Sequence, residues 1–257
     1  MDSTPQDPHR SANQSQKEHY DSYYSSEKSS KHLVRSEFKD DFLDYAIGHL
    51  RPSRNDHILE IGAGHGIMTK KLLSYGSRVT AVDISDSAIS NLNEIYRDQI
   101  ASKQLTTSVS DVDAVLADNV NSYTAIAGSG ILHHLPDLDK LFENMYNALC
   151  PGGRVLFAPE PNASGLYGLA WRFLAAPTYR LMNGNFDWEV EKGTLNIAFK
   201  PLSEKMRLCG FHNIHFLPYQ TIPHFQIKTL REIDRQLIKN KFLGRGSLYL
   251  TIYAEKP

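Results

Sequence analysis

The sequence predicts an α/β fold with a doubly wound sheet of mostly parallel strands. Short apolar runs rich in β-branched residues alternate with amphipathic helical patterns, as expected for parallel strands joined by helical crossovers. A glycine-rich turn joins the first of these strands to the next helix, where such sheets place their ligands. The chain of 257 residues is long enough to bury one sizeable core.

The predicted elements follow one another from residue 38 onward. A first helix is expected where apolar residues recur at four-residue steps until a proline ends the pattern: Phe38, Phe42, Ala46, Leu50 and Pro52. Strands are predicted over 57–61, 78–84, 105–110, 123–130 and 153–160, with helices over 68–76, 87–96 and 137–149. Asp137 is a good N-cap for the last of these helices. Further helices are predicted over 201–211 and 226–240, and further strands over 212–218 and 247–256.

Several segments differ in composition from the alternating strands and helices. Residues 1–32 contain no Leu, Ile, Val or Phe, so we expect residues 1–16 to be a disordered tail. Residues 17–36 include Tyr20, Tyr23 and Tyr24, which form either a lid over a ligand or part of a solvated tail. A Rossmann-like cofactor-binding core is expected over 37–161, completed by 201–218 and 247–257, and a helical cap over the acceptor is expected over 162–200 and 219–246.

Composition argues against several classes of protein. The 28 basic and 29 acidic residues give a net charge of −1, which disfavours nucleic-acid binding. Two cysteines cannot form a disulfide framework, and the polar residues 1–16 are unlike a secretory signal, so we expect a cytoplasmic protein. His212, His215 and His224 lack the spacing of a metal cluster, and no metal site is predicted.

The glycine-rich turn, Glu-Ile-Gly-Ala-Gly-His-Gly over 60–66, indicates the kind of ligand. A dinucleotide fingerprint beginning at Gly62 would need glycine where Ile67 stands, and the Gly-Lys-Ser/Thr of a phosphate loop is absent. Asp83 ends the second strand, where a carboxylate can accept hydrogen bonds from a ribose diol. Asp111 ends the third strand and could accept one from an adenine amine. These positions predict a nucleoside ligand without a pyrophosphate.

Five segments occur in a fixed order: EIGAGHGIMT (60–69), VDI (82–84), Asp111–Val112, ILHHLPD (131–137) and LCPGGRVL (149–156). Together they resemble the ordered motifs of class I S-adenosylmethionine-dependent methyltransferases, in the small-molecule branch of ubiquinone- and menaquinone-methyltransferase-like enzymes. The resemblance is strongest over 38–160. It implies a seven-stranded sheet in the order 3-2-1-4-5-7-6, with the last strand antiparallel.

The resemblance also implies S-adenosylmethionine as the cofactor, S-adenosylhomocysteine as its product, and a role for each matching position. In chain order, Tyr24 would cover the cofactor, Glu60 would orient the glycine loop, Gly62, Ala63, Gly64 and Gly66 would hold the methionine end, Asp83 would bind the ribose, Ile84 would pack on the adenine, Asp111 and Val112 would hold the adenine edge, and Ser129 and Gly130 would lie near the methionine amino group.

Proton removal from an acceptor needs a base, and His133 and His134 follow the fourth strand on the acceptor side. Either histidine is a base or a packing residue, and we favour His133. Glu160 ends the fifth strand on the same rim, and its alternative is a solvent-facing loop acid.

The predicted reaction is methyl transfer to a small hydrophobic or aromatic metabolite, with oxygen favoured. One alternative is a lipid-linked acceptor, with peripheral membrane contact through 162–179 and 226–243. Another is a regulatory protein that binds S-adenosylmethionine without catalysis.

Overall fold

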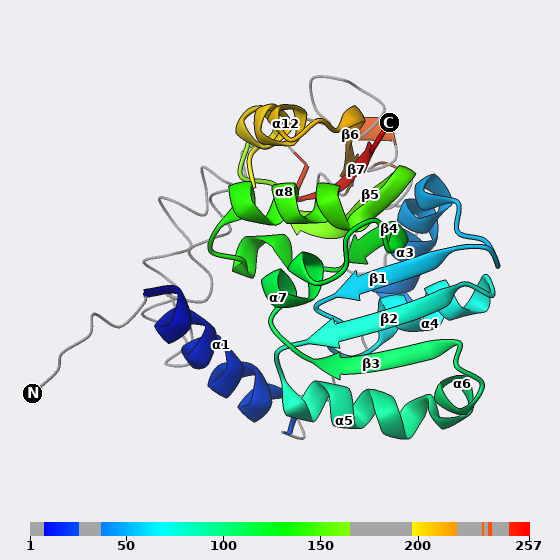
Figure 1. Ribbon diagram of the computed structural model, residues 1–257. Helices are drawn as coiled ribbons and strands as arrows, with labels where there is room; N and C mark the ends of the chain where they lie inside the picture. The colour runs from blue at the N-terminus through cyan, green and yellow to red at the C-terminus, as the bar shows by residue number, and fades with distance from the viewer. Residues whose placement is uncertain (1–7, 26–36, 165–196, 220–232, 234–235, 238–246) are drawn as a thin grey trace, which may run out of the picture.

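The computed structural model describes residues 8–25, 37–164, 197–219, 233, 236–237 and 247–257. Its centre is a seven-stranded sheet in the order β3-β2-β1-β4-β5-β7-β6 (Figure 1). The strands are β1 (His57–Ile61), β2 (Arg78–Asp83), β3 (Leu105–Val109), β4 (Tyr123–Gly128), β5 (Leu149–Pro161), β6 (His212–Tyr219) and β7 (Tyr249–Glu255). Strands β1 to β5 pair in parallel, and β7 is antiparallel to both β5 and β6. The predicted order and direction are confirmed.

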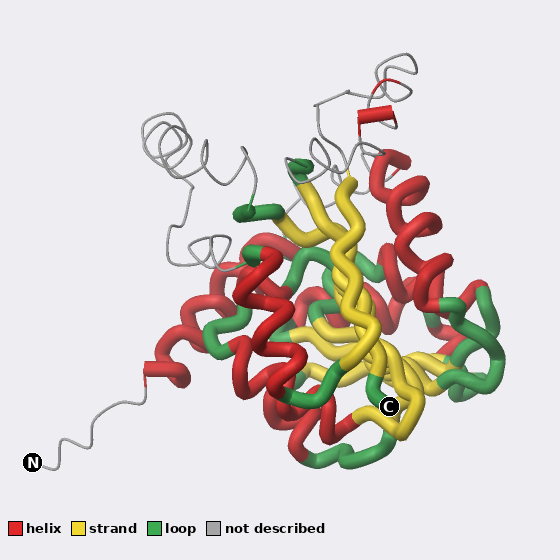
Figure 2. Tube along the Cα trace, turned by 90° about the horizontal axis from the view of Figure 1, so that it is seen from above, coloured by secondary structure: helices red, strands yellow, loops and turns green. Residues whose placement is uncertain are grey.

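Helices cover both faces of the sheet, which lies between them when seen from above (Figure 2). Their bounds are α1 (Pro8–Tyr24), α3 (Glu37–Leu50), α4 (Ile67–Ser74), α5 (Asp86–Ile95), α6 (Arg97–Ala101), α7 (Val112–Ala117), η1 (Leu132–His134), α8 (Leu138–Ala148) and α12 (Phe199–Leu208). Neighbouring residues of β1 show the two layers. Ile58 packs with α3 and α4, whereas Leu59 packs with α8 and α12, because successive side chains of a strand point to opposite faces.

Local chemistry explains where the helices begin. The carboxylate of Asp137 accepts hydrogen bonds from the backbone N–H groups of Asp139 and Lys140, which confirms the predicted N-cap of α8. Ser85 caps α5 in the same way through Ala88. Helices α5 and α7 start directly beyond the carboxyl ends of the neighbouring strands β2 and β3. Polar capping side chains therefore gather at that edge of the sheet.

The amino-terminal prediction is wrong over residues 8–16, because α1 already begins at Pro8. This helix is held in part by polar contacts that composition does not reveal. For example, the Gln16 side-chain amide donates to the backbone carbonyl of His134 across 2.6 Å, and Lys17 pairs with Asp86. Figure 1 shows α1 crossing the carboxyl ends of the parallel strands.

Other differences concern length and coverage. The short helices α6 and α7 were not predicted, and β5 begins at Leu149 rather than at residue 153. Most of the predicted cap (162–200 and 219–246), including the predicted helix over 226–240, lies outside the described residues. Within the described ranges, no helix has the length and apolar character needed to cross a membrane.

Candidate cofactor cleft

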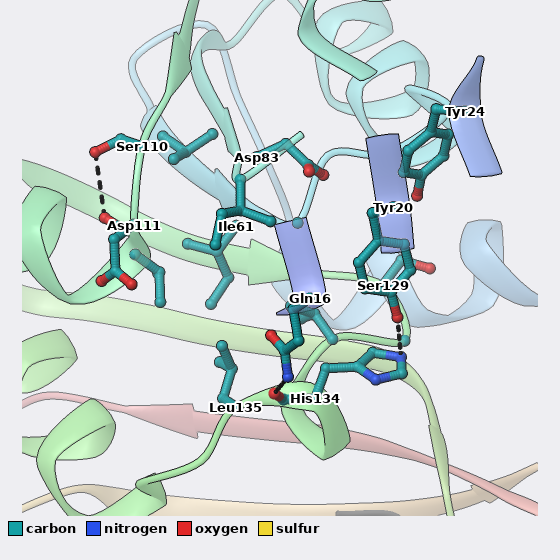
Figure 3. A pocket seen from close by; sticks show the side chains of 16 residues that line it. Gln16, Tyr20, Tyr24, Ile61, Asp83, Ser110, Asp111, Ser129, His134 and Leu135 are labelled. Carbon is teal, nitrogen blue, oxygen red and sulfur yellow. Dashed lines mark hydrogen bonds between the residues drawn. The ribbon is translucent and has the colours of Figure 1, made fainter. Parts of the chain in front are cut away.

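The predicted ligand-binding residues meet at one edge of the sheet. Ile61 of β1 pairs with Val82 of β2 and with Gly128 of β4, so these three strands end side by side. A cavity of about 130 Å³ opens beyond their ends, beneath α1 (Figure 3). Its lining includes most of the predicted positions, namely Tyr24, Gly62, Asp83, Ile84, Asp111, Val112, Ser129, Gly130 and His134.

The turn after β1 requires glycine at several positions. Gly62, Gly64 and Gly66 have φ values of 67°, 50° and 73°, in the left-handed region that side chains rarely adopt. A Cβ on Gly62 would lie 2.7 Å from the Ile131 side chain, and one on Gly64 would lie 2.6 Å from the Tyr24 hydroxyl. The turn therefore allows the Ile131 and Tyr24 side chains to approach its backbone closely.

The carboxylate of Asp83 holds this turn in place. Its Oδ2 accepts a hydrogen bond from the Gly64 backbone N–H, and its Oδ1 accepts one from the Ser85 N–H, both at 2.9 Å. Burial raises the pKa of Asp83, and these backbone hydrogen bonds offset the increase only in part. Each carboxylate oxygen has a further lone pair, so Asp83 can also accept from a ribose hydroxyl. The sequence indicated only the second of these roles.

Glu60 lies within β1 and is completely buried. Burial raises its pKa to about 8, the neighbouring Thr69 lowers it in part, and the charge of Asp83 raises it. Its Oε2 has no hydrogen-bond partner within the part of the chain that the structure describes. Glu60, Ala63, Gly64 and Gly66 are outside the cavity lining, whereas the other predicted cofactor-binding residues line it. The cofactor roles of both groups stay predictions.

Asp111 and Val112 follow β3 and line the cavity, and Figure 3 shows Asp111 on the side away from Tyr20 and Tyr24. Asp111 is also the N-cap of α7, where its Oδ1 accepts from the Asp113 N–H at 2.8 Å. The same carboxylate thus starts a helix and faces the cleft.

Helix α1 supplies Gln16, Tyr20 and Tyr24 to the cavity wall. Tyr24 packs its ring against His65 of the glycine turn, with centroids 4.8 Å apart. The hydroxyl of Tyr20 lies 3.0 Å from Nε2 of His134 (Figure 3). Gln16 was not predicted as a site residue, because one amide in a uniformly polar segment gives no local signal.

The same helix is anchored to the beginning of α5. Lys17 donates to the Ile84 carbonyl at 3.0 Å and forms an ion pair with Asp86. Asp21 accepts from the Ser85 hydroxyl at 2.7 Å. Burial acts to raise the pKa of Asp21, but hydrogen bonds to the carboxylate hold it below its usual value. Charged contacts therefore position α1 over the cleft.

Two neighbouring histidines of η1 have different surroundings. Nδ1 of His133 lies 2.9 Å from Oε2 of Glu160, whereas His134 lines the cavity and contacts Tyr20. Glu160 has no exposed surface, so the alternative of a solvent-facing loop acid is wrong. Its other oxygen accepts from the backbone N–H groups of Ile131 and Leu132 at 2.8 and 3.0 Å, and these partners make its burial tolerable.

The described residues contain no group of three His, Cys, Asp or Glu side chains arranged to hold a metal ion.

Comparisons with known proteins agree with this geometry. Residues 59–155 match the family model of a methyltransferase domain. The ubiquinone biosynthesis O-methyltransferase of Coxiella burnetii (strain Dugway 5J108-111) is 26% identical over 106 residues, which cover 41% of this chain and 44% of the relative. The same-named protein of Xanthomonas axonopodis pv. citri (strain 306) is 22% identical over 203 residues, covering 70% of this chain and 82% of the relative.

Among solved structures, phosphoethanolamine N-methyltransferase 2 of Haemonchus contortus, in complex with phosphomonomethylethanolamine and S-adenosylhomocysteine, has the same fold. Its TM-score is 0.57 at 19% identity, and the match covers 84% of this chain and 52% of that one. The chain spans a little under half the length of the first curated relatives that it matches. The matched domain and the fold are those of an α/β protein of the methyltransferase type. Over residues 59–155 the chain is therefore similar to the class I S-adenosylmethionine-dependent methyltransferases.

Proposed function

We propose that the protein binds S-adenosylmethionine in this cleft and transfers its methyl group to a small acceptor. The observation that carries the proposal is the convergence of the glycine turn, Asp83 and Asp111 at the carboxyl ends of adjacent parallel strands. This arrangement offers carboxylate oxygens to a ribose and an amine, and the sequence lacks a pyrophosphate cradle.

The residues present fit this cofactor in three respects. Ile84 and Val112 give the cleft apolar walls beside its carboxylates, which suits an adenine ring. Ser129 and Gly130 at the end of β4 line the wall next to the glycine turn, where the methionine end would lie. Gly62, in the left-handed region, brings its backbone to the cavity wall.

When bound, the cofactor supplies a methyl group already activated by a sulfonium. The protein's remaining tasks are to orient the acceptor, exclude water and take up a proton. Helix α1 supports the second task, because Tyr20, Tyr24 and Gln16 cover the cleft. For the third task we propose His133 as the base.

The acceptor we propose is a small hydrophobic or aromatic metabolite that is methylated on oxygen. The matched relatives are named as O-methyltransferases of ubiquinone biosynthesis, which supports oxygen as the target atom. Residues 162–200 hold both tryptophans of the chain, and aromatic side chains suit a flat acceptor. We place the protein in the cytoplasm, with no nucleic-acid partner.

Calorimetry of the full chain with S-adenosylhomocysteine tests the cofactor assignment. We expect one site with a micromolar dissociation constant, and the absence of binding at millimolar concentrations would refute the proposal. Transfer of a labelled methyl group is then measured with a panel of phenols, amines and polyprenylated phenols. Turnover only with detergent-solubilised prenylated phenols would favour the lipid-linked acceptor. Binding without turnover on any of these acceptors would favour the regulatory alternative.

A further inference from the structure

We infer that Glu160 is a positioning residue that fixes the tautomer of His133, leaving Nε2 of that ring as the proton acceptor. This inference rests on the proposed function and adds to it. The sequence indicated two candidate histidines without a way to separate them. The contacts of the two rings separate them.

The buried carboxylate of Glu160 has three donors around its two oxygens. Oε1 accepts from the backbone N–H groups of Ile131 and Leu132, and Oε2 lies 2.9 Å from Nδ1 of His133. An ionised carboxylate can only accept hydrogen bonds, so Nδ1 must carry the hydrogen in this pair. In the neutral ring the lone pair then belongs to Nε2.

The ring of His133 lies close to the cofactor cleft. Its Cε1, the carbon between the two nitrogens, is 4.0 Å from the position that a Cβ would take on Gly130, and Gly130 lines the cavity. The His133 side chain is 12% exposed, and the Glu160 side chain beside it is completely buried. The contact with Glu160 is therefore shielded from water, which strengthens it.

His134 is engaged differently. Its Nε2 lies 3.0 Å from the Tyr20 hydroxyl, and its backbone carbonyl accepts from Gln16. Both contacts lead to α1, so His134 helps to hold the helix that covers the cleft. In contrast, the ring of His133 is oriented by Glu160, an acid near the end of β5, and not by α1.

The proposed step moves one proton from the acceptor to the ring of His133. The acceptor hydroxyl gives its proton to Nε2 of His133, and the electron pair of the broken O–H bond stays on oxygen, which becomes the nucleophile. The imidazolium that forms is paired with Glu160, and its proton passes to water before the next turnover. A carboxylate in this place stabilises the charged ring and keeps it aligned.

Glu160→Gln separates positioning from a structural role. The amide oxygen can replace Oε1 as the acceptor for Ile131 and Leu132, since the opposite orientation would set amide donors against backbone donors. The amide N–H group then faces Nδ1 of His133 and donates to it. The variant thus preserves the anchor of η1 and reverses the preferred tautomer, leaving hydrogen on Nε2.

The experiment is long-range ¹H–¹⁵N NMR of the histidine rings in the full chain, with the His133 signals assigned from their loss in His133→Ala. We expect the Nδ1–H tautomer in the wild type and the Nε2–H tautomer in Glu160→Gln. In parallel, kcat of Glu160→Gln should fall at least about 100-fold, with affinity for S-adenosylhomocysteine within twofold of the wild type. Glu143→Gln, an exposed change on α8, is the matched control.

An Nε2–H tautomer of His133 in the wild type overturns the inference, whatever the behaviour of Glu160→Gln. A tautomer change with unaltered kcat also overturns it, while leaving methyl transfer intact. The double variant His133→Ala/Glu160→Gln should be no slower than His133→Ala, because Glu160 acts through that ring. A further loss in the double variant would show that Glu160 acts otherwise. A wild type that never methylates any acceptor refutes the proposed function itself, and the NMR result is read separately.

Discussion

Replacing Asp83 with alanine tests the cleft most directly. The change removes both carboxylate oxygens that accept from Gly64 and Ser85, and with them the acceptor proposed for the ribose. A hydrogen bond to a charged group contributes about 1.5–3 kcal/mol. Because each ~1.4 kcal/mol is a factor of ten in affinity, loss of one ribose hydrogen bond should weaken S-adenosylhomocysteine binding roughly 10- to 100-fold.

The same substitution should lower the stability of the free protein. Gly64 and Ser85 would keep buried N–H groups without an acceptor, at a cost of about 1–3 kcal/mol each. We therefore expect the free energy of unfolding to fall by about 2–6 kcal/mol in Asp83→Ala. Asp98→Asn, at an exposed position of α6, is the control and should change neither quantity.

Two measurements separate the effects. Calorimetry with S-adenosylhomocysteine, at a temperature where both proteins are folded, gives the affinity, and urea unfolding without ligand gives the stability. Reduced stability with unaltered affinity would refute the ribose assignment and leave Asp83 as a support of the glycine turn. If neither quantity changed, the interpretation of the whole cleft would be wrong.

Three further predictions concern other carboxyl groups. Because the native state holds the proton of Glu60 up to about pH 8 and the unfolded chain loses it earlier, the free energy of unfolding should fall between roughly pH 5 and 8, by at most ~1.4 kcal/mol per pH unit. Urea unfolding at several pH values should show a steeper fall in the wild type than in Glu60→Gln, where the raised pKa of Asp83 still contributes. Asp21→Ala should speed release of S-adenosylhomocysteine about tenfold by loosening α1, whereas Ser22→Ala, at an exposed position of the same helix, should not; a stopped-flow displacement assay showing equal rates would contradict the role of α1. Asp56→Ala breaks the ion pair with Arg154 at the amino ends of the strands. It should lower the free energy of unfolding by about 3–5 kcal/mol and leave ligand affinity unchanged. A changed affinity would show that the amino edge of the sheet is coupled to the cleft at the carboxyl edge.

Much of the core could be predicted because its signals are local. A buried strand such as β2 is a run of β-branched residues ending in an acid, and the N-cap Asp137 marks the start of α8. The helices α6 and α7 were missed because five and six residues make less than two turns. Such short helices carry too few apolar positions to show a period.

The position of α1 could not be predicted for a different reason. Its docking depends on single polar contacts with distant segments, such as those of Gln16 with His134 and of Lys17 with Asp86. Any one of these residues is ordinary in a solvated tail. Only the tertiary arrangement shows that they face acceptors on η1 and α5. The burial of Glu160 has the same origin, because its donors come from a loop about 30 residues earlier in the chain.

The three acids at the strand ends share a property that affects every experiment on this cleft. Asp83 holds the glycine turn, Asp111 caps α7, and Glu160 holds η1. Each one therefore builds a loop of the cleft wall in addition to its proposed role toward a ligand or a catalytic ring. Loss of activity on substitution cannot by itself distinguish these roles, since a displaced loop also displaces the groups that it carries. The distinction requires a measurement on the free protein, namely stability for Asp83 and Asp111 and the histidine tautomer for Glu160.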